Sequence, residues 1–288
     1  MIKSFSVIVG AYLNNLAHIL PKAAGKQGFK LFCHPFRTPI KPYHKQFFNT
    51  ADMFSFNHER VTVQGYRWGH GTKKILFLHG WQSHTFRWKN YIQSLSQDEY
   101  TVYAIDAPGH GLSTGNYLSV PFYSAVIQQL MSTLGHVHAV VTHSVGGFSA
   151  LHAFHEQPSI SVGKLILMAT PGKAWDFFQF YRDSIKLSDK TVQLILEYFQ
   201  NEFQKPIDYF STAEFAKKLT IPGYIIHDED DAEAPYHYAI KIKENWKNSM
   251  LITTKGLGHN IKSKEIVERV AQLISEQTHN VVKKSSGH

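Results

Sequence analysis

The sequence predicts an α/β fold in which a mostly parallel central sheet is flanked by helices. From residue 53 onward, short apolar and β-branched runs alternate with longer segments that have helical periodicity. Several of these runs are continuously apolar, as expected for parallel strands that are covered on both faces. The strand–helix–strand alternation requires crossover connections, which place helices on both faces of the sheet.

The strands are expected to begin with a hairpin of Met53–Glu59 and Val61–Trp68. The remaining strand predictions are Lys74–His79, Thr101–Asp106, Ala139–His143, Lys164–Ala169, Gly223–His227 and Met250–Thr253. Predicted helices lie between and after them, at Phe122–Leu134, Gly147–His155, Pro235–Asn248 and Lys264–Gln277. The chain of 288 residues is long enough for one large core, and residues 53–288 are predicted to form one domain.

The segment from Gly172 to about Phe215 interrupts this alternation, because it contains no strand-like run and is crowded with aromatic residues. A helical insertion over one sheet edge is therefore predicted at about residues 172–215. Ordinary helix packing accounts for most of the rings. A lid that lines an apolar pocket is the second interpretation.

Residues 1–52 form a basic N-terminal lead-in segment. The formal net charge is +8, and all seven cationic residues of this segment precede the first acidic residue, Asp52: Lys3, Lys22, Lys26, Lys30, Arg37, Lys41 and Lys45. One interpretation is a solvated basic face on a lead-in helix, and the other is a peripheral contact with anionic lipid headgroups. No nucleic-acid-binding motif accompanies the charge, so nucleic acid is not expected as a partner.

The apolar stretch Phe5–Leu13 is too short to span a bilayer and lacks a clear cleavage site after it. It is predicted to be part of an amphipathic helix. Cys33 is the only cysteine of the chain, which excludes an intramolecular disulfide and suits a reducing compartment. A cytoplasmic location, with membrane association as an alternative, is therefore expected.

The most informative motif is Val140-Val141-Thr142-His143-Ser144-Val145-Gly146-Gly147, in which a buried strand runs into a serine and then into a helix. A serine on such a sharp turn is exposed above the sheet edge and faces the free amides of the helix N-terminus. Glycines are needed there because strand and helix approach closely. Thr142 occupies the place of the first glycine of G-x-S-x-G. Alternatively, Ser144 is only a helix cap.

Two further segments precede this motif, Phe77-Leu78-His79-Gly80-Trp81 and Asp106-Ala107-Pro108-Gly109-His110-Gly111-Leu112-Ser113. They are similar to the His-Gly-x loop and to the D-x-P-G-x-G-x-S segment of the α/β-hydrolase superfamily. Over roughly residues 53 to 278, the chain resembles serine hydrolases of the esterase and lipase type. The resemblance implies the α/β-hydrolase fold, with Ser144 as nucleophile.

The resemblance also implies the other site residues. His259, in the loop after the last strand, is expected to be the catalytic base. The family pattern H-G-x-x-D aligns with His227 and Asp231, so Asp231 is expected to be the triad acid, with Asp230 in reserve. The backbone amides of Trp81 and Val145 would then form the oxyanion hole.

These residues would hydrolyse carboxylic esters of small or apolar substrates through an acyl-enzyme. Thioesterase, peptidase, C–C hydrolase and perhydrolase activities would use the same triad. A ligand-binding protein that retains the fold without catalysis is the alternative from another class. The reaction requires no cofactor, and no metal site is predicted. The sequence does not define the oligomeric state.

Overall fold

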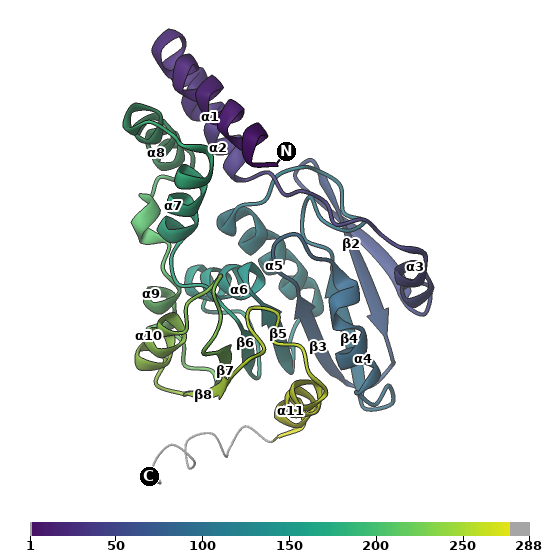
Figure 1. Cartoon of the computed structure of the whole chain (residues 1–288). Coiled ribbons are helices and arrows are strands. Elements are labelled where there is room, and N and C mark those ends of the chain that lie inside the picture. The colour runs from purple at the N-terminus through teal and green to yellow at the C-terminus, as the bar shows by residue number, and fades with distance from the viewer. Residues whose placement is uncertain (1, 277–288) are drawn as a thin grey trace. The chain divides into compact units, whose positions relative to one another are not determined.

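The computed structural model describes residues 2–276, which contain one sheet of eight strands and its flanking helices (Figure 1). The strand order is β1-β2-β4-β3-β5-β6-β7-β8. β1 and β2 pair antiparallel, β2 joins β4 antiparallel, and every other pair is parallel. The strands are β1 (Asp52–His58), β2 (Val61–Trp68), β3 (Lys73–Leu78), β4 (Tyr100–Ile105), β5 (Ala139–His143), β6 (Leu165–Met168), β7 (Gly223–Asp228) and β8 (Ser249–Thr254).

This topology confirms the predicted fold class. All residues of β5, β6 and β7 are buried, because helices cover both faces of the central strands. The continuous apolar runs of the sequence therefore mark the centre of the sheet. The predicted hairpin is confirmed as β1 and β2, with register pairs from Asp52 and Arg67 to His58 and Val61.

The chain divides into two compact units, which we call the helical unit and the sheet unit. The helical unit consists of Met1–His34 and Lys173–Ser211, and the sheet unit of Pro35–Gly172 and Thr212–His288. The helices of the sheet unit are α3 (Pro42–Phe48), η1 (Thr85–Trp88), α4 (Lys89–Gln93), α5 (Val120–Leu134), α6 (Val145–Glu156), α9 (Thr212–Ala216), α10 (His237–Asn245) and α11 (Lys264–Ser275).

The four helices predicted in this unit are present as α5, α6, α10 and α11, with shifted ends. α10 ends before Trp246, whose fully buried indole donates a hydrogen bond to the Ile221 carbonyl oxygen (2.9 Å). α11 ends at Ser275, and Gln277, the expected last residue, lies outside the described residues.

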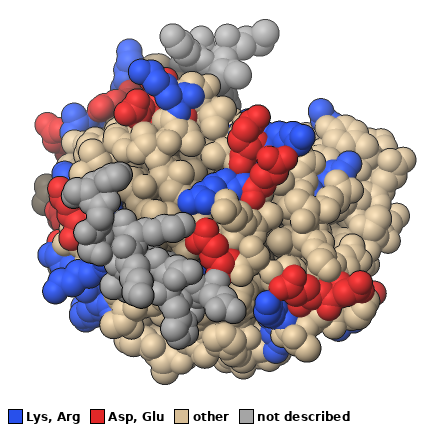
Figure 2. Space-filling view, turned by 90° about the horizontal axis from the view of Figure 1, so that it is seen from below, with Lys and Arg blue, Asp and Glu red and all other residues tan. Residues whose placement is uncertain are grey.

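Acidic and basic side chains are interspersed on the face of the molecule drawn in Figure 2, so neither sign of charge dominates that face.

The helical unit combines the N-terminal segment with the aromatic-rich insertion. It contains α1 (Ile2–Ile19), α2 (Pro21–Phe32), α7 (Ala174–Ile185), α8 (Asp189–Phe203) and η2 (Ile207–Tyr209). The predicted amphipathic helix at Phe5–Leu13 lies within α1. None of the helices in the described part of the chain is long and apolar enough to cross a membrane.

Two glycines allow the helices of this unit to approach each other closely. A Cβ on Gly10 would lie 1.6 Å from the Ile185 carbonyl oxygen, and one on Gly25 would lie 2.5 Å from the Leu194 carbonyl oxygen. Asn14 joins α1 to the turn between α7 and α8, since its amide nitrogen donates to the Lys186 carbonyl oxygen (3.0 Å). Its amide oxygen accepts from the Ser188 backbone amide (2.9 Å).

The two units do not divide at residue 52, where the sequence placed the boundary. Residues 35–51 group with the sheet unit, because Arg37 donates to the carbonyl oxygens of Gly111 (2.9 Å) and Gly115 (2.8 Å). Phe47 and Phe48 of α3 belong to its hydrophobic core. The boundary at residue 52 followed the change in charge composition, and composition does not record which apolar surfaces pack together.

Candidate active site

Ser144 lies at the turn between β5 and α6. Its backbone has φ 53° and ψ −125°, a conformation that is sterically unfavourable for a residue with a side chain. The Ser144 amide is held by a hydrogen bond to the Met168 carbonyl oxygen on the neighbouring strand (2.9 Å). The sharp strand-to-helix turn that the motif predicted is therefore present.

The glycine directly after this turn is required by close packing. A Cβ on Gly146 would lie 2.6 Å from the Leu78 carbonyl oxygen and 2.7 Å from the His79 carbonyl oxygen. Both contacts are with backbone atoms of the neighbouring loop, which cannot rotate away. The first turn of α6 thus lies directly against the end of β3.

Thr142 fits where a glycine is usual because Gly147 leaves space for it. A Cβ on Gly147 would lie 2.9 Å from the Thr142 hydroxyl and 2.2 Å from that of Thr170. Thr142 is fully buried, and its hydroxyl donates to the Ile166 carbonyl oxygen (3.2 Å). The departure from the usual motif is therefore accommodated locally.

The structure brings Ser144, His259 and Asp231 together. His259 Nε2 lies 3.0 Å from Ser144 Oγ, and His259 Nδ1 lies 2.9 Å from Asp231 Oδ2. Ser144 and Asp231 are buried to more than nine-tenths. The reserve candidate, Asp230, instead accepts a hydrogen bond from the Gly256 amide (3.1 Å).

The Asp231 carboxylate accepts several hydrogen bonds besides that of His259. Its Oδ1 accepts from the backbone amides of Glu233 (2.9 Å) and Ala234 (2.8 Å), and His227 Nε2 lies 3.3 Å from its Oδ2. Burial by itself would raise the pKa of Asp231. The hydrogen bonds from His227, His259 and the Ala234 amide outweigh burial and hold this pKa below its ordinary value. Asp231 is therefore ionised at neutral pH.

Two side chains that sequence reasoning did not single out hold the loop of His259. His143 Nε2 donates to the His259 carbonyl oxygen (2.8 Å), and Arg87 donates to the Asn260 carbonyl oxygen (2.6 Å). Burial lowers the pKa of His143 well below its ordinary value, so the ring is neutral. His143 directly precedes Ser144 in the sequence, and this position is the one feature that could have pointed to His143 as a residue of the site. Arg87 carries no motif.

The expected oxyanion loop passes directly against Ser144. A Cβ on Gly80 would lie 2.8 Å from the Ser144 Cβ. Trp81 therefore follows a backbone that touches the serine. Val145 is the first residue of α6, where helix amides lack intrahelical acceptors. Both expected donors are thus carried by backbone that adjoins Ser144.

Two neutral histidines fix the shape of this loop. His79 Nδ1 donates to the Gly80 carbonyl oxygen (2.8 Å), while its Nε2 accepts from the Ala107 amide (2.9 Å). His110 Nδ1 donates to the Pro108 carbonyl oxygen (2.9 Å), and its Nε2 accepts from the Gln82 amide (3.0 Å). Each ring needs one unprotonated nitrogen to accept its hydrogen bond. Burial lowers the pKa of both histidines to about 3.

This pairing predicts a loss of stability in acid that depends on His110. Between pH 6.5 and about 3, the unfolded chain binds a proton at this ring and the native protein does not, so acid favours unfolding. We expect the free energy of unfolding to fall by about 1.4 kcal/mol per pH unit for such a histidine. His110→Gln keeps an acceptor and cannot be protonated, so its urea-unfolding free energy should depend less on pH between 7 and 5. Parallel pH curves for the two proteins would contradict this account.

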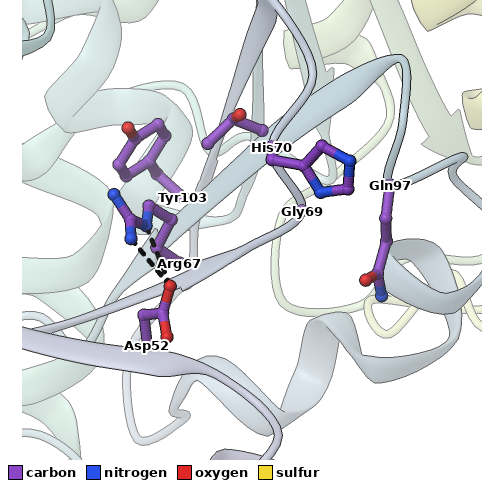
Figure 3. Close-up of a pocket in the computed structure, with 7 residues that line it drawn as sticks. Asp52, Arg67, Gly69, His70, Gln97 and Tyr103 are labelled. Carbon is purple, nitrogen blue, oxygen red and sulfur yellow. Dashed lines mark hydrogen bonds and ion pairs between the residues drawn. The ribbon is translucent and has the colours of Figure 1, made fainter.

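A pocket of about 440 Å³ lies elsewhere on the sheet unit (Figure 3). It contains the exposed ion pair between Arg67 and Asp52 (2.7 Å), and its other lining residues are Gly69, His70, Gln97, Thr101 and Tyr103. No residue of the Ser144 site lines it.

The sheet order and the site geometry define the class of the protein: it is a serine hydrolase with the α/β-hydrolase fold. The model of the family described as serine aminopeptidase, S33, matches residues 69–220, and the chain belongs to this family. The matched range includes Ser144 and ends before Asp231 and His259.

Similar proteins agree with this class. A bifunctional esterase/perhydrolase from Acinetobacter calcoaceticus is 23% identical over 248 residues, which cover 69% of this chain and 89% of that protein. A serine hydrolase-like protein from Danio rerio is 34% identical over 102 residues, which cover only 31% of each chain. The structure of a membrane phospholipase A, described as a bacterial virulence factor, is similar with a TM-score of 0.63 and 15% identity. That match covers 94% of this chain and 99% of the other.

Proposed function

We propose that the protein hydrolyses carboxylic esters of small or apolar substrates through an acyl-enzyme on Ser144. The observation that carries this proposal is the pair of contacts that connects the three side chains. Ser144 Oγ lies 3.0 Å from His259 Nε2, and His259 Nδ1 lies 2.9 Å from the Asp231 carboxylate. A serine hydroxyl becomes nucleophilic when a positioned base accepts its proton. The relative named as an esterase/perhydrolase supports an ester as the bond that is cleaved.

In the first step, Ser144 Oγ attacks the ester carbonyl carbon while His259 Nε2 takes the hydroxyl proton. Asp231 holds the imidazole in the tautomer with Nε2 free and stabilises the imidazolium that forms. The Val145 and Trp81 amides donate to the oxyanion, and one such donor contributes about 3–4 kcal/mol of transition-state stabilisation. His259 then protonates the leaving alcohol. In the second step, the same histidine activates water, which releases the acid and restores Ser144.

A series of p-nitrophenyl esters from acetate to decanoate tests this proposal. We expect saturable release of p-nitrophenol, with kcat/KM varying with acyl length because the acyl group binds beside Ser144. p-Nitrophenyl phosphate is the control with the same leaving group, and it should not be hydrolysed. Ester hydrolysis no faster than in buffer, from folded protein, would contradict the proposal.

A second candidate function is cleavage of an amino-terminal residue from a peptide, and Glu233 favours it. The Glu233 carboxylate is mostly exposed and lies 3.9 Å from His259 Nε2, the atom that faces the reacting bond. A carboxylate at that position attracts a cationic substrate group and repels an anionic one. Aminoacyl p-nitroanilides compared with acyl p-nitrophenyl esters separate the two candidates. Faster turnover of the anilides, lost in Glu233→Gln, would favour the peptidase.

The cytoplasmic location remains a prediction from the lone Cys33, which is buried. A protein with one cysteine forms no intramolecular disulfide, which suits the reducing cytoplasm.

A further inference from the structure

The α1–α2 hairpin of the helical unit exposes an apolar surface on α1. Ile8 is 65% exposed, Tyr12 53% and Ile19 75%. These residues lie at helical spacing on one side of α1, while Gly10 and Leu13 on the other side are buried. Exposed aliphatic residues that gather on one helix face indicate an interaction surface.

The second helix of the hairpin adds a row of cations. Lys22, Lys26 and Lys30 follow each other at intervals of four residues, so they lie along one face of α2, and all three are exposed. The opposite face of α2 is buried, and its Gly25 lies against Leu194 of α8. The lysine row is therefore not buried in the contact between α2 and α8.

The exposed apolar residues and the exposed lysines belong to two neighbouring helices of one hairpin. α1 buries Gly10 against Ile185 of α7, and α2 buries Gly25 against α8. The hydrogen bond between Tyr12 and Gln27 (3.0 Å) holds the two helices side by side. We call the exposed residues Ile8, Tyr12, Ile19, Lys22, Lys26 and Lys30 of these two helices the outer face of the hairpin.

Positive charge on this outer face is not neutralised within the hairpin. No acidic residue precedes Asp52 in the sequence. Within the described residues, no ion pair involves Lys22, Lys26 or Lys30. Elsewhere in the chain, exposed cations form ion pairs with neighbouring carboxylates.

We propose that the outer face of the α1–α2 hairpin docks on an anionic lipid bilayer. α1 would lie in the plane of the interface with Ile8 and Ile19 among the acyl chains, since it is not apolar enough to span. The lysines of α2 would then meet lipid phosphates and carboxylates. A lipid surface suits this face because it requires an apolar side next to cations and no complementary shape. Each lysine near an anionic bilayer strengthens binding about fivefold.

The test is sedimentation of the full-length protein with vesicles of phosphatidylcholine alone or with 30% phosphatidylserine. We expect binding to the anionic vesicles to be at least tenfold tighter, and to weaken as salt is raised because screening shortens the range of the lysine charges. The triple variant Lys22→Glu, Lys26→Glu and Lys30→Glu should lose about 100-fold in affinity. Ile8→Asp with Ile19→Asp should also bind weakly.

A triple variant of exposed sheet-unit lysines, Lys218→Glu, Lys241→Glu and Lys247→Glu, is the matched control, because it changes net charge by the same amount. It should bind like the wild type. Equal losses in both triple variants would show attraction by net charge and overturn the proposal, as would absence of wild-type binding. A dimer in analytical ultracentrifugation that Ile8→Asp disrupts, without vesicle binding, would assign the face to a second copy and also overturn it. Thermal unfolding of each variant checks that the fold is retained, and none of these readouts depends on catalysis.

Discussion

Ser144→Ala is expected to reduce kcat for p-nitrophenyl butyrate on the order of 10⁶-fold. The variant removes the atom that lies 3.0 Å from His259 Nε2 and that would form the acyl-enzyme. Alanine meets the same unfavourable backbone conformation at φ 53° as serine does, so the fold should be retained. Initial rates and labelling by a fluorophosphonate, read by intact mass, measure the effect.

Ser149→Ala is the matched control for this experiment. Ser149 is a fully buried serine on α6, the helix that follows Ser144. Its hydroxyl has no hydrogen-bond partner within the described residues. We expect near wild-type rates and a single fluorophosphonate label. Persistent labelling of Ser144→Ala, or a residual rate above 1%, would assign the nucleophile to another residue.

Asp231→Asn is expected to lower kcat/KM about 10⁴-fold, because an amide nitrogen can donate to His259 Nδ1 and stabilise the wrong tautomer. The loss should persist across the neutral pH range, since the hydrogen bonds that lower the pKa of Asp231 keep it charged there. Stabilisation by this carboxylate is present above its ordinary pKa and is lost as pH falls through the lowered native value. Rates across the neutral pH range and urea unfolding at neutral and acidic pH measure the two effects.

Asp230→Asn separates the two acid candidates. Asp230 lies next to Asp231, but its carboxylate accepts a hydrogen bond from the Gly256 amide (3.1 Å) and not from His259. Its substitution should change kcat/KM by no more than a few-fold. A larger loss in Asp230→Asn than in Asp231→Asn would reverse the assignment of the acid.

Ser144 could be predicted from a local pattern with a physical cause, whereas Asp231 and His259 were predicted from the resemblance to the family. Ser144 is marked by the glycines that close backbone approach requires, and the structure places Gly146 against the carbonyl oxygens of Leu78 and His79. The central strands were evident because burial on both faces demands continuous apolar sequence. Motif residues and fully buried strands can thus be predicted from a single segment of sequence.

Contacts between distant segments were not readable in this way. Arg87 and His143 hold the His259 loop through backbone carbonyl oxygens, which every residue possesses, so the sequence carries no sign of the pairing. The division of the compact units after His34 differs from the predicted boundary for a related reason. Gly10 packs against a carbonyl oxygen 175 positions later in the chain, at Ile185, and a single sequence does not record that contact.

The divided origin of the helical unit affects how the protein is made. α1 and α2 leave the ribosome roughly 140 residues before α7 and α8, so at ordinary translation speeds they wait on the order of ten seconds for their partners. During that interval Phe29, which the finished protein buries against Tyr198, Phe199 and Phe203 of α8, lacks these partners. We therefore expect the first two helices to complete their packing only after α7 and α8 have been synthesised.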